Sequence, residues 1–544
     1  MNEQKTIWLV SREYAGIAEA GGVKNVVRAL AEQLYQNNFN VCVFIPLYGC
    51  TAVQKIRDFK IREHAARIKA ENREYTLHFA EGLFHHISFV FIIHSLFTEK
   101  SGVYTYTEAE ERLNHRHMQG KGHEDALLLN VLFQKGVLEY GRLCAAKDIK
   151  RNSIPDIIHC HDAAAALIPF IARNDALYDN TYNTTRFVLT IHNAGNAYRH
   201  EIDKDRAALF LQLPEHLFDG CVISGCCEPY LLAEPYAELT TVSPWYAKEL
   251  TDPRDANSGG LSAVFARRNT RITGITNGIE YDTYNPANIS VSMLPHTFNP
   301  SAGDFTGKYR CRKEFIEYYS NPFHKKNRPE LKQYGFLLPP DTMPIPDSTM
   351  PDTNGLHKTV FFSYHGRMVH QKGTNILADA AKIVLKNCDY VRFIVTGQGN
   401  TELEKQQEAL ADQFPGKYLY LRGYERSAAR LCVAVADFIV LPSIFEPCGL
   451  EDFIAQLYGT IPIAHACGGL QKIVDGKTGF LYADNTPDTL ARILSALAAK
   501  KQKNPDFFTA LAAKAAQYVQ NEYSWKKIIS TAYIPLYENV CKNV

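Results

Sequence analysis

The stretch "LPSIFEPCGLEDFIAQLYGTIPIAHACGGLQKIVDGKTGFLY" (residues 441–482) holds the features that decide the fold of this chain. A short apolar strand pattern, "DFIVLP" (437–442), leads into it, and Gly449-Leu450 can open a helix. A second strand pattern, "IPIA" (461–464), follows that helix. Strand, turn, helix and strand in this order predict a parallel α/β unit, whose ligands bind beyond the carboxyl ends of the strands.

The residue types in this stretch support two interpretations. The free N–H groups at a helix start suit a diphosphate, and Glu446 can accept hydrogen bonds from sugar hydroxyls. Alternatively, Glu446 is an acidic loop residue and Cys448 a buried thiol, because glycine-containing turns between strands and helices are common.

The same alternation of strands and helices extends over most of the chain, in two blocks. Strand patterns of the first block are "TIWLV" (6–10), "VCVFIP" (41–46), "HISFVFII" (86–93), "DIIHC" (156–160), "RFVLTI" (186–191), "LTTVS" (239–243) and "RITGIT" (271–276). The second block has "TVFFSYHG" (359–366), "YVRFIVTG" (390–397) and "YLYLRG" (418–423) before the two strands named above. This pattern predicts an α/β protein with two Rossmann-like, doubly wound domains.

Domain boundaries follow from where the alternation stops. Residues 286–357 are rich in Pro, Asp, Ser and Thr, which predicts a linker and a surface insertion. The prediction is an N-terminal domain over 1–285, a C-terminal domain over 358–520, and a helical segment over 521–544 that packs back on the N-terminal domain.

Composition excludes several classes of protein. The chain has 544 residues and a formal net charge of +1, so no overall field attracts nucleic acid or a membrane. The 13 scattered cysteines form no zinc-type pairs, and their odd number favours a reduced, cytoplasmic location. The N-terminal apolar run is too short for a signal peptide.

The stretch "FFSYHGRMVHQKGTNIL" (361–377) places two cations in a turn between a strand and a helix. Arg367 and Lys372 there could neutralise a departing nucleoside diphosphate. Paired basic residues in a loop are otherwise more often exposed surface, and both interpretations stay open at this point.

Polar residues also follow two strands of the first block. His192 comes directly after "RFVLTI", and Asp162 ends the run "IIHCHD". Functional side chains of α/β sheets emerge at such positions. Neighbouring residues of a strand point to opposite faces, so His159, Cys160 and His161 do not favour a metal site.

With these motifs in view, the chain resembles the bacterial glycogen synthase and plant starch synthase family, which are retaining glucosyltransferases of the two-domain GT-B fold. "FEPCGL" (445–450) is the most specific motif, supported by "TVSPWYAKEL" and "ITGITNGIEYDTYNP" within 241–286, "HGRMVHQKG" and "GTIPIAHACGGL". The resemblance covers nearly the whole chain except residues 50–120 and 320–357.

The resemblance implies roles for residues of the second block. Arg367 and Lys372 would hold the donor's phosphates, and Glu446 would contact the transferred glucose. An aromatic ring, Tyr424, would pack on the nucleotide base. Further contacts to the sugar and phosphate would come from Gly397 and from the amides around Cys448, Gly449 and Leu450.

In the first block, the resemblance implies that His192 lies beside the glucose and Asn277 near the reacting centre. Asp162 would stand on the acceptor side. Gly21 and Gly22 would form a turn that approaches the donor closely. The implied reaction is transfer of glucose from a nucleotide sugar, ADP-glucose, to the non-reducing end of an α-1,4-glucan. Arg and Lys would supply the positive charge, so no metal or cofactor is expected.

Several positions depart from the family's pattern. The family's Lys-x-Gly-Gly-Leu near the N-terminus is here "EAGGV", with Glu19 in the place of the lysine, and Lys24 follows. The Thr-Gln after "FEPCGL" is Glu451-Asp452, the Trp-His after the His-Asp pair is Ala163-Ala164, and "GGLxDTV" is "GGLQKIV" (468–474). We expect Glu19 either to turn away from the donor or to accept hydroxyls from a different sugar.

Three hypotheses follow. The first is an active α-glucan synthase. The second is a related glycosyltransferase that uses UDP-glucose or a small sugar. The third is a non-catalytic glucan-binding relative, and the intact cations Arg367 and Lys372 favour the first two over it, because a binding module has no use for a phosphate clamp.

Overall fold

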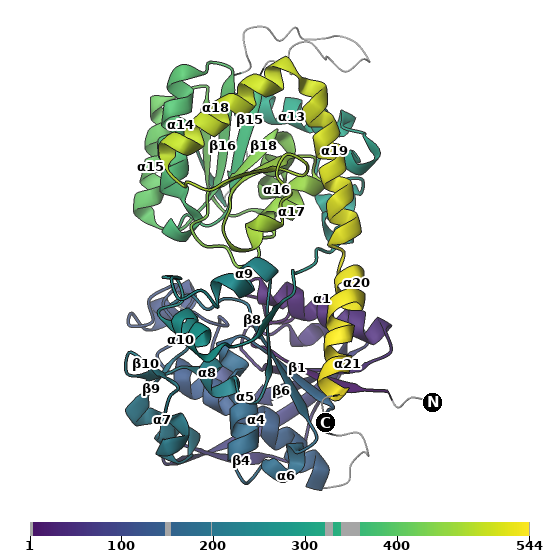
Figure 1. The fold of residues 1–544 in the computed structure, drawn as a ribbon, viewed down its shortest axis with the longest axis vertical. Helices are drawn as coiled ribbons and strands as arrows, with labels where there is room; N and C mark the ends of the chain where they lie inside the picture. Colours follow the sequence, from purple (N-terminus) through teal and green to yellow (C-terminus); the bar gives the residue numbers. More distant parts are fainter. Residues whose placement is uncertain (1–3, 147–153, 197, 321–329, 339–358, 543–544) are drawn as a thin grey trace. The chain divides into compact units, whose positions relative to one another are not determined.

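In the computed structural model, the chain folds into two compact units. Unit 1 comprises Met1–Asn277 and Trp525–Val544, and unit 2 comprises Gly278–Ser524. The structure describes residues 4–146, 154–196, 198–320, 330–338 and 359–542 (Figure 1). No helix in this described part of the chain is long and apolar enough to span a bilayer.

Unit 1 is built on a ten-stranded sheet in the order β13-β12-β8-β7-β1-β2-β6-β5-β3, with β4 paired to β5. The strands from β13 to β6 are parallel, and β3, β4 and β5 add an antiparallel edge. The strand bounds are β1 Thr6–Val10, β2 Asn40–Pro46, β3 Arg57–Ile61, β4 Ala66–Ala70, β5 Arg73–Phe84, β6 Ile87–Ile93, β7 Ile157–His161, β8 Arg186–Ile191, β12 Glu238–Thr241 and β13 Ile272–Gly274.

The helices of unit 1 connect these strands, and a small second sheet joins them. That sheet has the order β10-β11-β9, with β9 Ile202–Asp203, β10 Val222–Ile223 and β11 Cys226–Cys227. The helices are α1 Val23–Gln36, α2 Ser95–Thr98, α3 Glu108–Leu113, α4 Ala126–Ala146, α5 Leu167–Asn174, α6 Asp179–Tyr182, α7 Lys204–Leu211, α8 Pro229–Ala233, α9 Pro244–Glu249, α10 Leu261–Arg268, α20 Trp525–Ile528 and α21 Ile534–Lys542.

Unit 2 has a seven-stranded sheet in the order β14-β17-β16-β15-β18-β19-β20, parallel except for β14. Its strands are β14 Leu331–Gly335, β15 Val360–His365, β16 Val391–Gly397, β17 Tyr418–Gly423, β18 Phe438–Leu441, β19 Ile461–His465 and β20 Phe480–Tyr482. Its helices are α11 Tyr281–Tyr284, α12 Ile289–Ser292, α13 Thr306–Tyr319, α14 Thr374–Asn387, α15 Thr401–Gln413, α16 Arg426–Val435, α17 Glu451–Leu457, α18 Pro487–Lys503 and α19 Pro505–Glu522.

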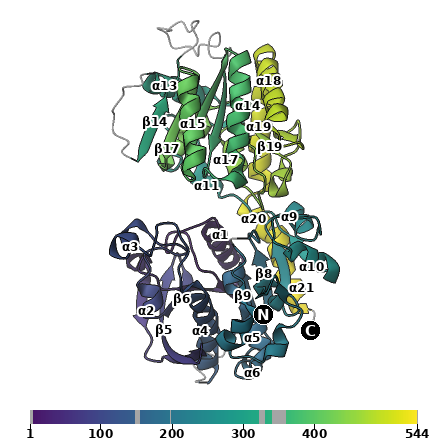
Figure 2. The ribbon, with the colours of Figure 1, turned by 90° about the vertical axis from the view of Figure 1, so that its left-hand side faces the viewer.

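The sheet of unit 2 separates two apolar cores. Along β15, Phe362 and Tyr364 pack with α14, α15 and α18, whereas Phe361 packs with α13, α16 and α17. Alternate residues of a strand point to opposite faces, so a run of apolar residues can fill both cores. Figures 1 and 2 both show α14 and α18 side by side on one face of this sheet. The predicted α/β class with two Rossmann-like units is therefore confirmed.

The structure differs from the predicted linker over residues 286–357. Helix α13 lies in that range, and its Cys311, Phe315 and Ile316 are buried in the core of unit 2. The division between the units falls after Asn277 instead of after residue 285, and the segment grouped with unit 1 begins at Trp525. Residues 321–329 and 339–358 of the predicted insertion lie outside the described residues.

Candidate active site

A cavity of about 390 Å³ opens in unit 2 at the carboxyl ends of four parallel strands. The last residues of β15, β16, β17 and β18 line it, namely His365, Gly397, Gly423 and Leu441. The predicted site residues among its lining are Arg367, Lys372, Gly397, Tyr424, Glu446, Gly449 and Leu450. This is the position at which α/β sheets bind their ligands.

Glycines allow the loops around this cavity to approach one another. Gly373 has a φ of 65°, and a Cβ there would lie 1.9 Å from the carbonyl oxygen of Pro442. A Cβ at Gly397 would lie 1.9 Å from the carbonyl oxygen of Gly366. Only glycine fits such contacts. Gly397, predicted as a substrate contact, is therefore also required for packing the 366–368 loop.

The charged groups of the cavity face each other across the turns after β15 and β18. Lys372 forms an ion pair with Glu446, whose carboxylate also accepts a hydrogen bond from the Ser443 hydroxyl at 3.2 Å. Arg367 is exposed, and its guanidinium has no ion-pair partner among the residues that the structure describes. A phosphate entering here would meet one free guanidinium and one lysine that is already close to a carboxylate.

Tyr424 forms an aromatic wall of the same cavity. Its side chain is 57% exposed, so the ring is accessible to a ligand in the cavity. The Tyr424 and His365 rings lie 6.3 Å apart at an interplanar angle of 28°. The two rings form a flat, partly exposed surface on which a nucleotide base can stack.

In unit 1, the turn "EAGGVKNVV" is organised by a residue that sequence reasoning missed. The carboxylate of Glu13 accepts hydrogen bonds from the amides of Ala20 and Gly21, at 3.0 and 2.5 Å. Glu13 is fully buried, and burial raises the pKa of its carboxyl. The turn thus binds an anion, but the anion comes from the protein itself. Its position directly after β1, at the carboxyl end of the sheet, is the one feature that could have identified it.

Glu19 and Lys24 pair with each other beside this turn. The Glu19 carboxylate accepts from the amide of Gly16 at 2.5 Å and forms an ion pair with Lys24 at 3.1 Å. Both groups therefore have local partners, and whether Glu19 also accepts hydroxyls from a different sugar stays a prediction. Gly22 caps α1 with a φ of −85°, and a Cβ there would meet nothing within 4 Å. The fold itself thus does not require glycine at position 22.

His192 and Asp162 are joined at the ends of β7 and β8. The Asp162 carboxylate accepts from the amides of His192 and Asn193 at 2.7 and 3.2 Å, and from the Tyr230 hydroxyl at 3.3 Å. Asp162 has φ 62° and ψ 177°, a strained conformation of the kind found at functional sites. Sequence reasoning singled out Asp162 and His192 separately, and the structure joins them, because Asp162 holds the backbone amide of His192.

Burial sets the charge states of this group. The pKa of His192 is lowered to about 3 and that of Asp162 is raised to about 7, in both cases mainly by burial. His192 Nε2 lies 3.0 Å from Nδ1 of His161, another histidine whose pKa burial lowers. His192 is therefore a neutral imidazole at neutral pH, suited to hydrogen bonding a sugar and not to carrying charge.

Two further predicted residues stand apart from these contacts. Asn277 is buried, and its Oδ1 has no hydrogen-bond partner among the described residues. Cys448 is buried too and does not line the cavity with Arg367 and Lys372. Its carbonyl oxygen instead accepts a hydrogen bond from Lys472 at 2.6 Å, a residue that sequence reasoning assigned no role.

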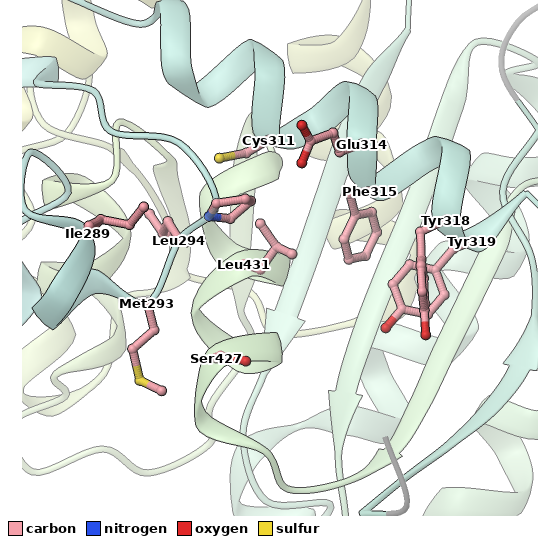
Figure 3. A pocket seen from close by; sticks show the side chains of 11 residues that line it. Ile289, Met293, Leu294, Cys311, Glu314, Phe315, Tyr318, Tyr319, Ser427 and Leu431 are labelled. Carbon is pink, nitrogen blue, oxygen red and sulfur yellow. The ribbon is translucent and has the colours of Figure 1, made fainter. Parts of the chain in front are cut away.

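A second pocket of unit 2 has a different character (Figure 3). Its volume is about 440 Å³, and α12, α13 and α16 line it with side chains such as Ile289, Phe315 and Leu431. The described lining contains no Lys or Arg and none of the predicted site residues. A diphosphate would find no cation there, so the cavity at the strand ends is the candidate site.

Two families of known proteins match the chain, one in each of its two units. Residues 6–267 match the family of the starch synthase catalytic domain, and residues 359–500 match glycosyl transferases group 1. The first match lies within unit 1 and the second within unit 2.

Known proteins resemble the chain over nearly its whole length. Glycogen synthase of Thermodesulfovibrio yellowstonii is 27% identical over 542 residues, which cover 98% of this chain and 97% of that protein. Glycogen synthase of Flavobacterium johnsoniae is 28% identical, over 86% of this chain and 85% of that protein. Among solved structures, the catalytic domain of starch synthase IV from Arabidopsis thaliana, bound to ADP and acarbose, has a TM-score of 0.76 at 21% identity and covers 99% of this chain and 100% of its own. These matches, in the same order along the chain as the two units, show that it belongs to the glycogen and starch synthase family of glycosyltransferases.

Proposed function

We propose that this enzyme transfers glucose from ADP-glucose to the non-reducing end of an α-1,4-glucan, with retention of configuration. The observation that carries the proposal is the cavity of unit 2, which combines Arg367, the Lys372–Glu446 pair and the exposed Tyr424. Two cations, a sugar-binding carboxylate and a stacking surface are the groups that a nucleotide sugar needs.

Each residue takes a part in the reaction. The bond from the glucose C1 to the diphosphate breaks, and Arg367 and Lys372 stabilise the charge that collects on the leaving phosphate. When the donor binds, Lys372 exchanges part of its contact with Glu446 for the phosphate, and Glu446 accepts hydrogen bonds from glucose hydroxyls. The acceptor hydroxyl forms the new bond to C1 on the face that the diphosphate leaves, and its proton passes to the oxygen of the departing phosphate. The two cations thus do the work that a metal ion does in other glycosyl transfers.

In unit 1, His192 is a neutral imidazole because burial lowers its pKa to about 3, and the Asp162 carboxylate accepts a hydrogen bond from its amide. Such an imidazole can form a hydrogen bond with a sugar hydroxyl. A neutral imidazole adds no positive charge next to a sugar that itself becomes positive in the transition state. The Arabidopsis starch synthase IV named above was solved with ADP, which supports adenine as the base.

The test is a direct assay. Purified enzyme is incubated with glycogen and either ADP-glucose or UDP-glucose, and both nucleotide release and glucan growth are measured. We expect release of ADP coupled one to one with glucan growth, and a new α-linkage in the product by NMR. Turnover with UDP-glucose alone would move the enzyme to another donor class. An absence of turnover with both donors would refute the proposed activity.

A further inference from the structure

A buried ion pair lies directly behind the loop that carries Glu446. Lys472 and Asp452 are 2.9 Å apart, and their side chains are 1% and 0% exposed. Lys472 also lies 4.5 Å from the centre of the Phe453 ring. Buried pairs of this kind seldom add stability over apolar side chains, so their presence calls for another explanation.

The ammonium group of Lys472 binds backbone carbonyls of this loop. It donates to the carbonyl oxygens of Cys448 at 2.6 Å and Gly449 at 3.1 Å. It also donates to the carbonyl of Gly469 at 3.2 Å, in the turn Gly468–Lys472. One lysine thereby holds two turns together through three carbonyls and one carboxylate.

The contacts to the loop fix the direction of two amides. In a trans peptide the N–H points opposite to the C=O of the same plane. Because the Cys448 and Gly449 carbonyls point at Lys472, the N–H groups of Gly449 and Leu450 point away from it. Both residues line the cavity, and neither N–H has a hydrogen-bond partner within the described part of the chain.

Glycines show how tightly this arrangement is packed. A Cβ at Gly469 would lie 2.3 Å from the carbonyl oxygen of Cys448. Gly449 has a φ of 76°, and a Cβ there would lie 3.3 Å from Nζ of Lys472. The amide of Gly469 also donates to the Glu446 carbonyl at 2.8 Å. The loop therefore has little freedom to turn its peptide planes while Lys472 is in place.

We propose that Lys472 is a positioning residue for glucosyl transfer, which orients the amides of Gly449 and Leu450 toward the diphosphate and sugar of the donor, and that Asp452 holds the ammonium group in place. This rests on the proposed function. The two residues are complementary, because each would leave a buried charge unpaired without the other.

The experiment compares Lys472→Met with the double variant Lys472→Met/Asp452→Asn. The single variant leaves a buried carboxylate without its cation and loses stability as well as donor binding. The double variant removes both charges, so it regains stability. The carbonyls of Cys448, Gly449 and Gly469 still lack the ammonium group that donates to them in wild type. We expect ADP to bind at least about tenfold more weakly to both variants, the scale of one or two lost charge-assisted hydrogen bonds.

Lys308 provides a matched control. It is also buried in unit 2, and it donates to the carbonyls of Ala434 and Tyr458 at 2.6 and 3.0 Å, away from the cavity. Lys308→Met should lower the melting temperature while the dissociation constant of ADP stays within about threefold of wild type. Asp452→Asn keeps the lysine, so its dissociation constant for ADP should lie between those of Lys308→Met and Lys472→Met.

Isothermal titration calorimetry with ADP and with UDP gives the dissociation constants, and steady-state kinetics give the KM of the donor and of glycogen. The inference predicts weaker nucleotide binding and a raised donor KM, with the glycogen KM unchanged. It is overturned if the double variant binds nucleotide as well as wild type, or if wild type binds neither nucleotide. A wild type that binds ADP without elongating glycogen would refute the proposed function alone.

Discussion

At the scale of single residues, the proposed function assigns Arg367 and Lys372, which line the cavity of unit 2, to the leaving diphosphate. We expect Arg367→Ala and Lys372→Ala each to reduce turnover at least about a hundredfold, the scale for losing a group that stabilises charge in a transition state. The measurement is kcat with saturating ADP-glucose and glycogen. Lys382→Ala, an exposed lysine of α14, is the control and should be active. Near-normal turnover in both cavity variants would refute the phosphate clamp.

Glu446 tests the sugar side of the same cavity. Glu446→Gln keeps the size of the side chain and its contact with the Ser443 hydroxyl, but it loses the charge that faces Lys372. We expect transfer to be abolished while the free energy of unfolding changes by about 1 kcal/mol or less, since a partly exposed ion pair contributes little stability. Calorimetry and the glycogen assay measure the two effects. A large fall in melting temperature would favour a structural role for this carboxylate.

His123 in unit 1 gives a prediction for pH. It is 4% exposed, neither ring nitrogen has a partner among the described residues, and burial lowers its pKa to about 4. Its neutral form is favoured in the folded state, so its contribution to stability is complete above pH 6.5 and is lost as the pH falls toward 4. As the pH falls through that interval, the free energy of unfolding of His123→Phe should therefore rise relative to that of wild type, by at most about 1.4 kcal/mol per pH unit. Urea unfolding at pH 7.5, 6 and 5 measures the difference, and a difference that does not change with pH would contradict the prediction.

At the scale of elements, two glycines that precede helices have different reasons to be there. Gly373 precedes α14 with a φ of 65°, and a Cβ there would collide with the Pro442 carbonyl. Gly22 precedes α1 with an ordinary φ and open space around it. We expect Gly373→Ala to cost at least about 2 kcal/mol of unfolding free energy and Gly22→Ala about 1 kcal/mol or less. Chemical denaturation checks both values. Equal losses would show that the turn at Gly22 is also held by packing.

The predictability of the elements depended on their burial. Strands buried on both faces, such as β1 and β8, are made mostly of apolar residues and were predicted with the bounds that the structure shows. β4 buries alternate residues only, so its sequence "ARIKA" mixes apolar and charged residues and predicts a strand much less clearly. α13 was missed because Pro-rich and Asp-rich sequence surrounds it, although its own apolar residues are buried.

The site was predictable only in part, for a related reason. Groups that follow strands meet at one edge of a parallel sheet, so Arg367, Tyr424 and Glu446 could be expected together. The contacts of Glu13 with Gly21 and of Lys472 with Cys448 depend instead on how loops fold back on themselves. Lys472 and Asp452 were both visible in the sequence as unexpected charges, but their pairing and the contact with the Cys448 carbonyl were not.

At the scale of the whole molecule, unit 1 is completed by the C-terminal segment of the chain, which follows unit 2 in the sequence. The chain leaves unit 1 at Asn277, forms unit 2, and returns so that Trp525–Val544 belongs to unit 1. In this segment Trp525, Ile529, Tyr533 and Tyr537 are buried, and the Tyr537 hydroxyl lies 2.7 Å from Nδ1 of His159 within unit 1. His159 also contacts the Thr190 hydroxyl at 2.6 Å, so the segment reaches the strands that carry the His192 group.

Removal of this segment should therefore harm unit 1 and spare unit 2. We expect a chain that ends at Ser524 to lose several kcal/mol of unit 1 stability, because four large side chains leave the core and His159 loses a buried hydrogen bond. Scanning calorimetry should show the transition of unit 1 at a much lower temperature. ADP, which we expect to bind in the cavity of unit 2, should still raise the temperature of the other transition. A chain that ends at Val540 keeps Tyr537 and serves as the control, with both transitions near their wild-type temperatures. If the shorter chain lost ADP binding along with the first transition, the two units would unfold as one, and the segment would be part of a single cooperative structure.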